Sequence, residues 1–436
     1  MNVADSMRVA SALEQRGYRS TTQPEEADLI VLNTCVVRQS AEDKAYNRLL
    51  SLRPLKKKNP KLVINLMGCM VGIRGDNRLK ERFSFVDIFS PPSDPGPLLT
   101  YLSQAENREF LQTQTENRFN VMDNQYPEVE LPIPLNKRGG LVSSFVPVVL
   151  GCSHACTFCI IPYRRGVERS RLPADIIREV NALVENGVKE IILLGQIVDR
   201  YGKDLSDGHS LASLLRSLVK VEGLERIRFL TSHPNWMTND LMDTVAELDK
   251  VMPHIEVPVQ AGDDEVLFNM RRRYTSKEYN KLIWQIRDTI PGVSIGTDII
   301  VGFPGEKESQ FQNTYDMLAD LKLDMAHIAR YSPRPGTVAK RHMVDDVPDE
   351  EKWRRFRILE ELQERIATEI NARYMGKSIE VLFEEKVRDR WRGRTPTNKL
   401  VFIQSDADLL GKVRGVRITW TGPWSMLGNL EDNQIS

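Results

Sequence analysis

Residues 151–159 read GCSHACTFC, and this stretch decides both the fold and the chemistry of the chain. It places Cys152, Cys156 and Cys159 in the spacing C-x3-C-x2-C. The apolar run 146–150 predicts a buried strand, so the thiols follow the carboxyl end of that strand. Three thiolates from one short loop can hold three irons of a four-iron cluster and leave the fourth iron open.

The open iron suggests a particular use. It can chelate the amino and carboxylate groups of S-adenosylmethionine and pass an electron to the sulfonium, which releases a 5′-deoxyadenosyl radical. Two other interpretations stay open on these residues alone. His154 can complete a structural zinc site with the three thiols, or the cysteines are inert buried thiols. The spacing and the position after a strand favour the iron cluster.

Around this loop the sequence repeats a strand–loop–helix pattern. Apolar runs predict strands at 146–150, 190–194, 226–230, 254–259, 293–300 and 325–331. Helical periodicity predicts helices at 173–186, 211–219, 239–248, 276–289 and 309–321. Repeated units of this kind predict an α/β fold, a partial (β/α)6 TIM-like barrel with its active site in the loops after the strands.

The first segment, residues 1–110, predicts a smaller α/β domain. A helix is expected from Val3 to Leu13, and the runs 29–32 and 62–66 predict parallel strands. Cys35 and Cys69 come just past the carboxyl ends of these strands, at the sheet edge where ligands bind. Without further context, both would be plain buried thiols.

The last segment, residues 373–436, follows a polar linker at 112–140, the barrel and a charged helix at 348–374. Short strands are expected at 379–383, 400–403, 413–421 and 426–430, a pattern typical of a small all-β barrel. Residues 386–417 contain nine basic and three acidic side chains, and Trp391 and Phe402 lie among them in the sequence. A nucleic-acid surface and a solvated charged face explain this composition equally well. The basic residues are Lys386, Arg388, Arg390, Arg392, Arg394, Lys399, Lys412, Arg414 and Arg417.

Composition excludes several classes of protein. The 436 residues suffice for two or three domains. Lys and Arg number 60, as do Asp and Glu, so any nucleic-acid contact needs a local patch. Five cysteines, an odd number, argue against a disulfide framework. Neither a signal peptide nor an apolar run of about 20 residues is present, so we expect a cytoplasmic protein without membrane contact.

Further motifs follow the cysteine loop in a fixed order. They read PYRRG (162–166), LLGQ (193–196), SHP (232–234), PVQAG (258–262), VGFPGE (301–306) and YSPRPGT (331–337), and NTC (33–35) and GC (68–69) precede the loop. In these motifs, and over nearly the whole chain, the sequence resembles the radical S-adenosylmethionine methylthiotransferases. Through PYRRG, LGQ and GRTPTN (393–398), it is most similar to the members that make 2-methylthio-N(6)-dimethylallyladenosine in tRNA.

The resemblance implies S-adenosyl-L-methionine and two [4Fe-4S] clusters as cofactors. Cys152, Cys156 and Cys159 map onto the ligands of the radical cluster. Cys35 and Cys69 map onto two of the three ligands of an accessory cluster, which supplies or activates the inserted sulfur.

The third accessory ligand precedes a Met-Asn pair in the family, and this chain starts at Met1-Asn2. The third cysteine is therefore absent from this chain. A truncated or mis-started record is expected, and a natively short form with an impaired accessory cluster is the alternative.

Cofactor contacts are expected after the barrel strands, while no catalytic residue is assigned. The resemblance places Gly195 and Gln196 beside the methionine amino group, although Gln196 can equally cap the strand. Gly302 and Pro304 either pack against the adenine or form a plain strand-to-helix turn. Phe158 either shields the cluster, contacts adenine, or packs in the core.

Several charged side chains near these motifs have two interpretations. Four arginines either bind a phosphate or the cofactor carboxylate, or lie in a solvated loop. They are Arg164, Arg165, Arg169 and Arg171. His233 and His254 are expected to be hydrogen-bonded structural histidines rather than catalytic groups.

The expected function is methylthiolation of C2 of N(6)-isopentenyladenosine at position 37 of tRNA. Alternatives within the family act on threonylcarbamoyl-adenosine or on an aspartate of a ribosomal protein. Alternatives outside the family are a different radical S-adenosylmethionine enzyme, such as a methyltransferase, and a non-catalytic tRNA-binding protein with an impaired accessory cluster.

The expected organisation is an accessory-cluster domain (1–110), a radical domain (138–372) and a third domain (373–436) that resembles the RNA-binding TRAM barrel. That last resemblance makes the basic residues a tRNA surface. Expected partners are the anticodon loop of tRNA, whose bases can splay out, and an electron donor such as flavodoxin or ferredoxin. The chain is expected to be a monomer.

Overall fold

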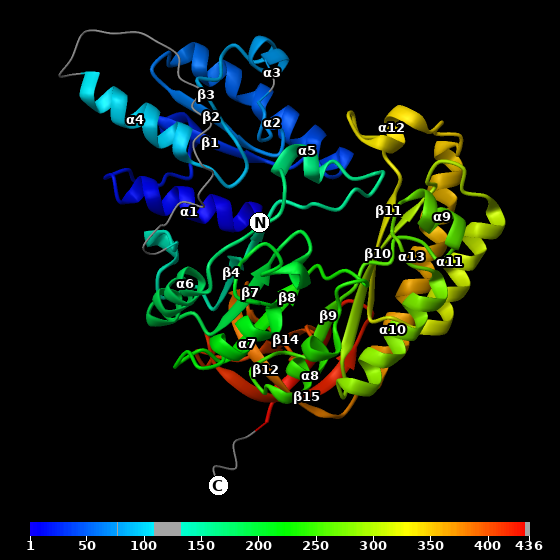
Figure 1. Ribbon diagram of the computed structural model, residues 1–436. Coiled ribbons are helices and arrows are strands. Elements are labelled where there is room, and N and C mark those ends of the chain that lie inside the picture. The colour runs from blue at the N-terminus through cyan, green and yellow to red at the C-terminus, as the bar shows by residue number, and fades with distance from the viewer. Residues whose placement is uncertain (76, 109–131, 432–436) are drawn as a thin grey trace. The chain divides into compact units, whose positions relative to one another are not determined.

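The computed structural model describes residues 1–75, 77–108 and 132–431 (Figure 1). Contacts divide the chain into two compact units. One comprises Met1–Asn136, Leu150–His154 and Cys159–Arg171, and the other comprises Lys137–Val149, Ala155–Phe158 and Leu172–Ser436. Most of the expected linker at 112–140, the end of the first expected domain at residue 110 and the chain end after residue 431 lie outside the described residues.

The first unit is built on a parallel sheet in the order β1-β2-β3. The strands are β1 (Leu29–Thr34), β2 (Val63–Gly68) and β3 (Ile88–Ser90), and the helices are α1 (Asn2–Glu14), α2 (Gln39–Lys58), α3 (Asn77–Arg82), α4 (Gly96–Arg108) and α5 (Ile161–Arg165), with η1 (Pro24–Glu26) and β6 (Arg169–Ser170). The expected helix and both expected strands are confirmed.

Both faces of this sheet are covered because side chains of β2 alternate in direction. Ile64 and Leu66 pack with Leu49 and Leu52 of α2. Met67, on the opposite face, packs in a second cluster with residues of α1 and α4. The loops that follow the strands lie at the carboxyl edge of the sheet.

The second unit contains a curved parallel sheet. Its strands are β4 (Ser143–Pro147), β7 (Glu190–Leu194), β8 (Arg226–Leu230), β9 (His254–Glu256), β10 (Ser294–Val301) and β11 (Met325–Arg330). They pair in the orders β4-β7-β8 and β9-β10-β11, and a parallel bridge between Ile227 and Val251 links the two groups. The strands therefore follow one another in chain order as a partial barrel, as expected from the sequence.

Helices cover the outside of this barrel (Figure 1). They are α6 (Pro173–Glu185), α7 (Leu211–Leu218), α8 (Asn239–Glu247), α10 (Ser276–Thr289) and α11 (Glu308–Leu321). Shorter elements are β5 (Val149–Leu150), η2 (Leu135–Lys137), η3 (Val198–Arg200), α9 (Asp264–Asn269) and α12 (Val338–His342). Strand residues such as Ile191, Ile227 and Ile295 are fully buried, as strands covered on both faces require. The expected helices are confirmed, whereas α9 and α12 are too short to produce a periodic pattern.

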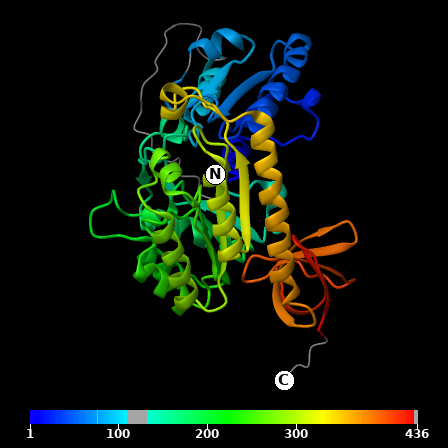
Figure 2. The ribbon, with the colours of Figure 1, turned by 90° about the vertical axis from the view of Figure 1, so that its right-hand side faces the viewer.

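A closed barrel forms the end of the chain, with strand order β12-β13-β14-β16-β15. The strands are β12 (Ser378–Val387), β13 (Arg390–Arg394), β14 (Leu400–Gln404), β15 (Val413–Thr421) and β16 (Met426–Leu430). Figure 2 shows this barrel beside the carboxyl half of α13 (Asp349–Ala372), where Asn371 Nδ2 donates to Gly422 O at 2.8 Å. The expected all-β barrel is confirmed, and β13 is an addition to it.

The turn between β13 and β14 docks on the amino ends of the barrel strands. Arg228 pairs with Glu190 (Nε–Oε1 2.7 Å), and its two terminal nitrogens donate to Pro396 O and Thr395 O, both at 2.7 Å. Arg226 donates to Arg394 O at 2.8 Å. The motif at 393–398 therefore serves, in this structure, as the contact between the two barrels.

His254 belongs to the same contact. Its ring Nδ1 lies 2.7 Å from Ser294 Oγ, and its Nε2 lies 3.2 Å from Asn398 Nδ2. Burial lowers the pKa of His254 below its usual value, although Glu256 opposes the shift. These bonds are those of a hydrogen-bonded structural histidine, the role expected for it.

Within the described ranges, no helix combines the length and apolar character that crossing a bilayer requires.

Candidate metal centre

Cys152 is fixed by the backbone of the segment that follows the loop. Its N–H donates to Gly166 O at 3.0 Å. Gly151 has φ +74°, and a Cβ there would lie 2.1 Å from Val167 O, so only glycine allows this approach. The glycines at 151 and 166 thus place the first thiol within the first unit.

Cys156 is fixed by contacts inside the second unit. The neighbouring Thr157 donates from its N–H to Met270 O (3.2 Å), and Ala339 N donates to Thr157 O (2.8 Å). Thr157 Oγ1 donates to Asn269 O at 2.9 Å. The short segment that carries this thiol is therefore attached to the end of α9 and the start of α12.

Phe158 packs beside the same elements. It is half-buried against a hydrophobic cluster that includes Met270, Phe303, Tyr331 and Ala339. Core packing thus accounts for its apolar side chain, and its exposed part stays available to a bound group.

Arg272 reaches the Cys156 sulfur. Its Nη1 donates to Cys156 Sγ at 3.4 Å and its Nη2 donates to Pro258 O at 2.8 Å. Its Nε donates to the Tyr274 hydroxyl at 2.9 Å, and that hydroxyl donates to Val259 O at 2.6 Å. Arg272 is only 5% exposed, and each of its three guanidinium nitrogens donates one of these hydrogen bonds.

The donor set fits an iron–sulfur cluster. None of Cys152, Cys156 and Cys159 forms a disulfide, and soft thiolates are the ligands that such clusters use. Among the described residues, no three His, Cys, Asp or Glu side chains already converge as a metal site. The fit therefore depends on the chemistry of the three thiols.

The edge after the barrel strands has features that suit a second bound group. Ser232 follows β8, and its buried Oγ has no hydrogen-bond partner among the described residues. Gln196 is half-buried after β7, next to Gly195, where a Cβ would lie 2.9 Å from Val198 Cα. An unsatisfied buried hydroxyl is costly, so the Ser232 hydroxyl is a candidate to bond a polar ligand.

The turn after β10 is organised by α13. Gly302 has φ +70°, and a Cβ there would lie 2.3 Å from Lys352 Cγ. Gly302 N donates to Glu306 Oε2 at 2.5 Å, and Arg355 pairs with the same carboxylate at 2.8 Å. These contacts explain Gly302 as part of a strand-to-helix turn, and Pro304 is buried in it.

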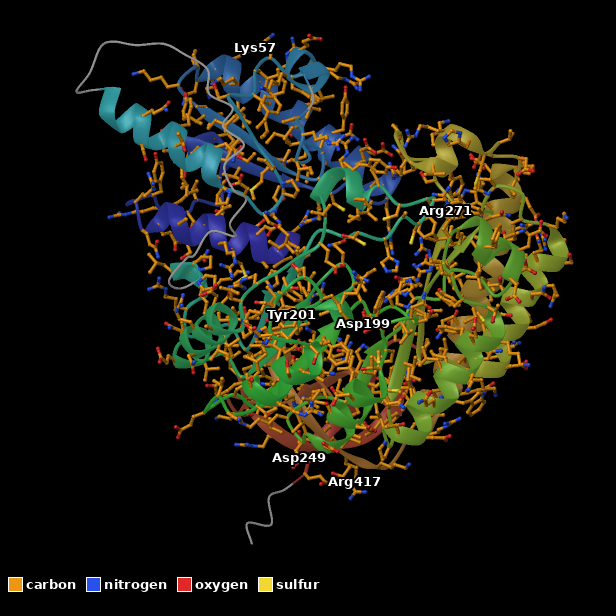
Figure 3. The ribbon with its side chains drawn as sticks, in the orientation of Figure 1. Lys57, Asp199, Tyr201, Asp249, Arg271 and Arg417 are labelled. Carbon is orange, nitrogen blue, oxygen red and sulfur yellow. The ribbon has the colours of Figure 1, made fainter. Side chains whose placement is uncertain are left out.

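His233 is held by its backbone. Its N–H donates to the Asp199 carboxylate at 2.9 Å, and its ring lies edge-on to Tyr274 at 5.7 Å. Figure 3 labels Asp199 and Tyr201, which mark the η3 turn after β7. This environment agrees with the structural role expected for His233.

Cys35 and Cys69 emerge side by side from the sheet of the first unit. Thr34 and Gly68, the last residues of β1 and β2, are partners in the parallel register. Cys69 N donates to Thr34 O at 3.0 Å. Burial raises the pKa of the Cys69 thiol, an effect that Arg165 opposes and Cys35 reinforces. The predicted position of both thiols at one sheet edge is confirmed.

Arg165 is a buried partner of this second thiol group. It is 7% exposed, donates to Asn2 Oδ1 at 2.9 Å and Ser93 Oγ at 3.1 Å, and lies 3.6 Å from Asp5 Oδ2. A solvated loop does not describe this side chain, nor is it free to hold a phosphate. Arg164 donates to Met70 O at 3.3 Å and likewise belongs to the unit's internal contacts.

Several cations of the expected nucleic-acid surface pair with acids. Arg392 pairs with Glu385 at 2.6 Å, Lys399 with Asp324 at 2.7 Å, and Arg417 with Glu431 at 3.0 Å. Trp391 is 6% exposed and belongs to the core of the β-barrel. The exposed cations Lys386, Arg388 and Arg390 surround the turn between β12 and β13.

Sequence reasoning missed Arg272 and Tyr274. Arg271, Arg272 and Arg273 are indistinguishable as a run of cations, and only the folded chain buries the middle one and exposes the other two. Ser232 lies in a quoted motif, yet nothing in its sequence context marks its hydroxyl as unsatisfied.

Comparison with known proteins agrees with this geometry. The Radical SAM superfamily model matches residues 146–318, and the model of Uncharacterized protein family UPF0004 matches residues 1–90. Among solved structures, a radical S-adenosylmethionine methyltransferase, TsrM, from Kitasatospora setae has a TM-score of 0.53 at 15% identity, over 76% of this chain and 70% of that one. The cobalamin-dependent radical enzyme OxsB has a TM-score of 0.52 at 13% identity, over 83% of this chain and 53% of that one. These likenesses show the fold alone.

Fold and cysteine loop together define a radical S-adenosylmethionine protein. Curated relatives named tRNA-2-methylthio-N(6)-dimethylallyladenosine synthase are much more similar. The one from Herpetosiphon aurantiacus is 45% identical over 99% of this chain and 95% of its own length, and the one from Roseiflexus sp. (strain RS-1) is 46% identical over 99% and 87%. The chain therefore belongs to the radical S-adenosylmethionine methylthiotransferases, in the family of the tRNA-2-methylthio-N(6)-dimethylallyladenosine synthases.

Proposed function

We propose that this chain methylthiolates C2 of N(6)-isopentenyladenosine at position 37 of tRNA by a radical mechanism. One observation carries the proposal: a C-x3-C-x2-C loop after the first strands of a radical S-adenosylmethionine barrel, in a chain 45% identical to a relative named for this product. Cys152, Cys156 and Cys159 would hold the cluster, whose open iron would bind S-adenosylmethionine.

When bound, the cluster supplies one electron to the sulfonium of S-adenosylmethionine, which yields the radical that activates the substrate. The chain's own residues bind and orient. Gln196 and Ser232, after β7 and β8, would bind the methionine part of the cofactor. The turn that contains Gly302 and Pro304 would bind the adenine, and the exposed part of Phe158 would shield the cluster from water.

Cys35 and Cys69 would hold a second [4Fe-4S] cluster, which would supply the inserted sulfur. Their adjacent positions at one sheet edge support this role, because two ligands of one cluster must leave the backbone close together. Arg165, which interacts with Cys69, balances the negative charge of such a site.

The closed β-barrel binds tRNA as a TRAM-like domain. Support comes from the exposed cations Lys386, Arg388 and Arg390 on one turn, which suit phosphate contacts. The domains we propose are 1–110 for the accessory cluster, 138–372 for the radical reaction and 373–436 for tRNA. Flavodoxin or ferredoxin donates the electron to this cytoplasmic monomer.

Mass spectrometry of tRNA nucleosides tests the proposal in a strain that lacks this gene. We expect the methylthio-isopentenyladenosine peak to vanish and isopentenyladenosine to accumulate. The wild-type gene restores the product, whereas a Cys156→Ala variant does not. An unchanged methylthio-isopentenyladenosine peak in the deletion strain rejects the assignment.

A further inference from the structure

We propose that Arg272 is a positioning residue that holds the Cys156 sulfur and makes the radical cluster easier to reduce. The inference rests on the proposed function, in which Cys156 is a cluster ligand.

The guanidinium has one orientation available to it. Each of its nitrogens has a separate acceptor: the Tyr274 hydroxyl at 2.9 Å, Pro258 O at 2.8 Å and Cys156 Sγ at 3.4 Å. Pro258 and Val259 follow the carboxyl end of β9, so the arginine joins the cysteine loop to the mouth of the barrel. A planar fork held at two nitrogens directs the third toward the sulfur.

The backbone around Arg272 is shaped to turn this side chain inward. Arg271 and Arg273 have φ +58° and +60°, a left-handed backbone conformation that is unfavourable because neither residue is glycine. Their side chains are exposed, whereas Arg272 is 5% exposed; Figure 3 labels Arg271 on this loop. Two non-glycine residues with left-handed backbone on either side of one buried cation indicate that this strained conformation has a functional role.

The charge of Arg272 lacks an ordinary counter-charge. Buried charges are normally paired, and Arg228 and Arg355 pair with Glu190 and Glu306. Within the part of the chain that the structure describes, no carboxylate forms an ion pair with Arg272. Burial raises the pKa of the Tyr274 hydroxyl, so that partner is neutral. The remaining hydrogen-bond partner of Arg272 is the sulfur of Cys156.

A thiolate bound to a cluster supplies the missing negative charge. A charge-assisted N–H···S bond withdraws electron density from the sulfur, and hydrogen bonds to sulfur are among the factors that set cluster potentials. Reduction adds one electron and one negative charge to the cluster, with no bond formed or broken. Arg272 stabilises that charge, so the cluster accepts an electron at a higher potential.

The experiment uses the full chain with Cys35→Ala and Cys69→Ala, so that only the radical cluster is loaded. Anaerobic redox titration with dithionite, followed by electron paramagnetic resonance, gives the midpoint potential. Arg272→Met is compared with Arg271→Met and Arg273→Met, which remove the same charge from the exposed neighbours. We expect Arg272→Met to lower the midpoint potential of the cluster by about 59 mV, which for one electron is a tenfold change in the reduction equilibrium. Both controls should keep the midpoint potential of the parent.

Arg272→Lys keeps the charge but loses the fork, so we expect a smaller shift in the same direction. If Arg272→Met loses iron while both controls keep it, the holding role is supported, and Arg272→Lys then decides the effect on potential. A fully loaded Arg272→Met variant with the parent's potential overturns the inference. Where Arg272→Met cannot be loaded, an Arg272→Lys variant with the parent's potential overturns it. Failure of the parent to take up iron would instead contradict the proposed function.

Discussion

Buried arginines lie near both ends of the partial barrel, and they are neutralised in different ways. At the amino end, Arg228 pairs with Glu190 and donates to main-chain carbonyls of the 394–398 turn. At the carboxyl end, Arg272 has no carboxylate partner among the described residues and donates to Cys156. The charge of Arg228 at the amino end is neutralised inside the chain and stabilises the fold, whereas we propose that Arg272 at the carboxyl end acts on a cofactor site. This division agrees with the general placement of barrel active sites.

The largest effect should come from the sulfur that Arg272 contacts. A Cys156→Ala variant should release no 5′-deoxyadenosine above background under anaerobic dithionite, because the cluster loses one of its three ligands. Liquid chromatography of the reaction measures this. Cys35→Ala is the matched control and should keep cofactor cleavage while losing the methylthio product. Retained cleavage in Cys156→Ala would show that the loop does not ligate the cluster.

Removing the arginine at the amino end should instead destabilise the fold. Arg228→Met leaves the buried Glu190 carboxylate without its cationic partner, although Ser143 Oγ still donates to it, and breaking a buried pair in this way typically costs about 3–5 kcal/mol. Urea unfolding, followed by circular dichroism, measures the loss in the transition of the second unit. Arg216→Met, which breaks the exposed pair with Asp240, should cost less than about 1 kcal/mol. Equal stability of the two variants would remove the distinction between the barrel ends.

A smaller effect is expected where the docking turn adopts a left-handed backbone. Asn398 has φ +62° and contacts His254 and Arg394 through its side chain. Asn398→Ala loses these contacts and adds about 1–2 kcal/mol of backbone strain. Asn398→Gly loses only the contacts, so its melting temperature should lie between those of Asn398→Ala and the wild type. Identical melting temperatures of the two variants would show that the backbone conformation is not fixed.

The smallest effect concerns pH at the same contact. The pKa of His254 is lowered in the folded chain, chiefly by burial, so the unfolded chain binds more protons near the usual value of 6.5. Stability should therefore be complete above pH 6.5 and fall as the pH drops toward the folded pKa. Thermal unfolding of His254→Gln should show a weaker dependence on pH in this window. An unchanged slope would mean that His254 is not the group responsible.

The barrel could be predicted from the sequence because short strands that contain apolar residues alternate with helical patterns along the chain. The strand β13 could not, since Arg390–Arg394 alternates cations with Trp391 and Gly393 and is a strand only because β12 and β14 pair with it. The basic residues of 386–417 also indicate a more positive surface than the folded chain has. Acids outside this range, such as Glu385 and Glu431, pair with some of these cations.

The thiols of the site could be predicted because their spacing is local. Arg272 could not, because its burial depends on left-handed backbone at Arg271 and Arg273 and on acceptors at residues 258 and 274. Arg165 is a similar case, since its partners Asn2, Asp5 and Ser93 are distant in sequence.

Electron paramagnetic resonance of the reduced full chain, with Cys35 and Cys69 replaced by alanine, tests the radical centre most directly. The account predicts about four irons per chain and a spectrum that changes when S-adenosylmethionine is added, because the cofactor occupies the iron that the three cysteines leave open. A colourless protein, zinc in place of iron, or a spectrum indifferent to S-adenosylmethionine would contradict it.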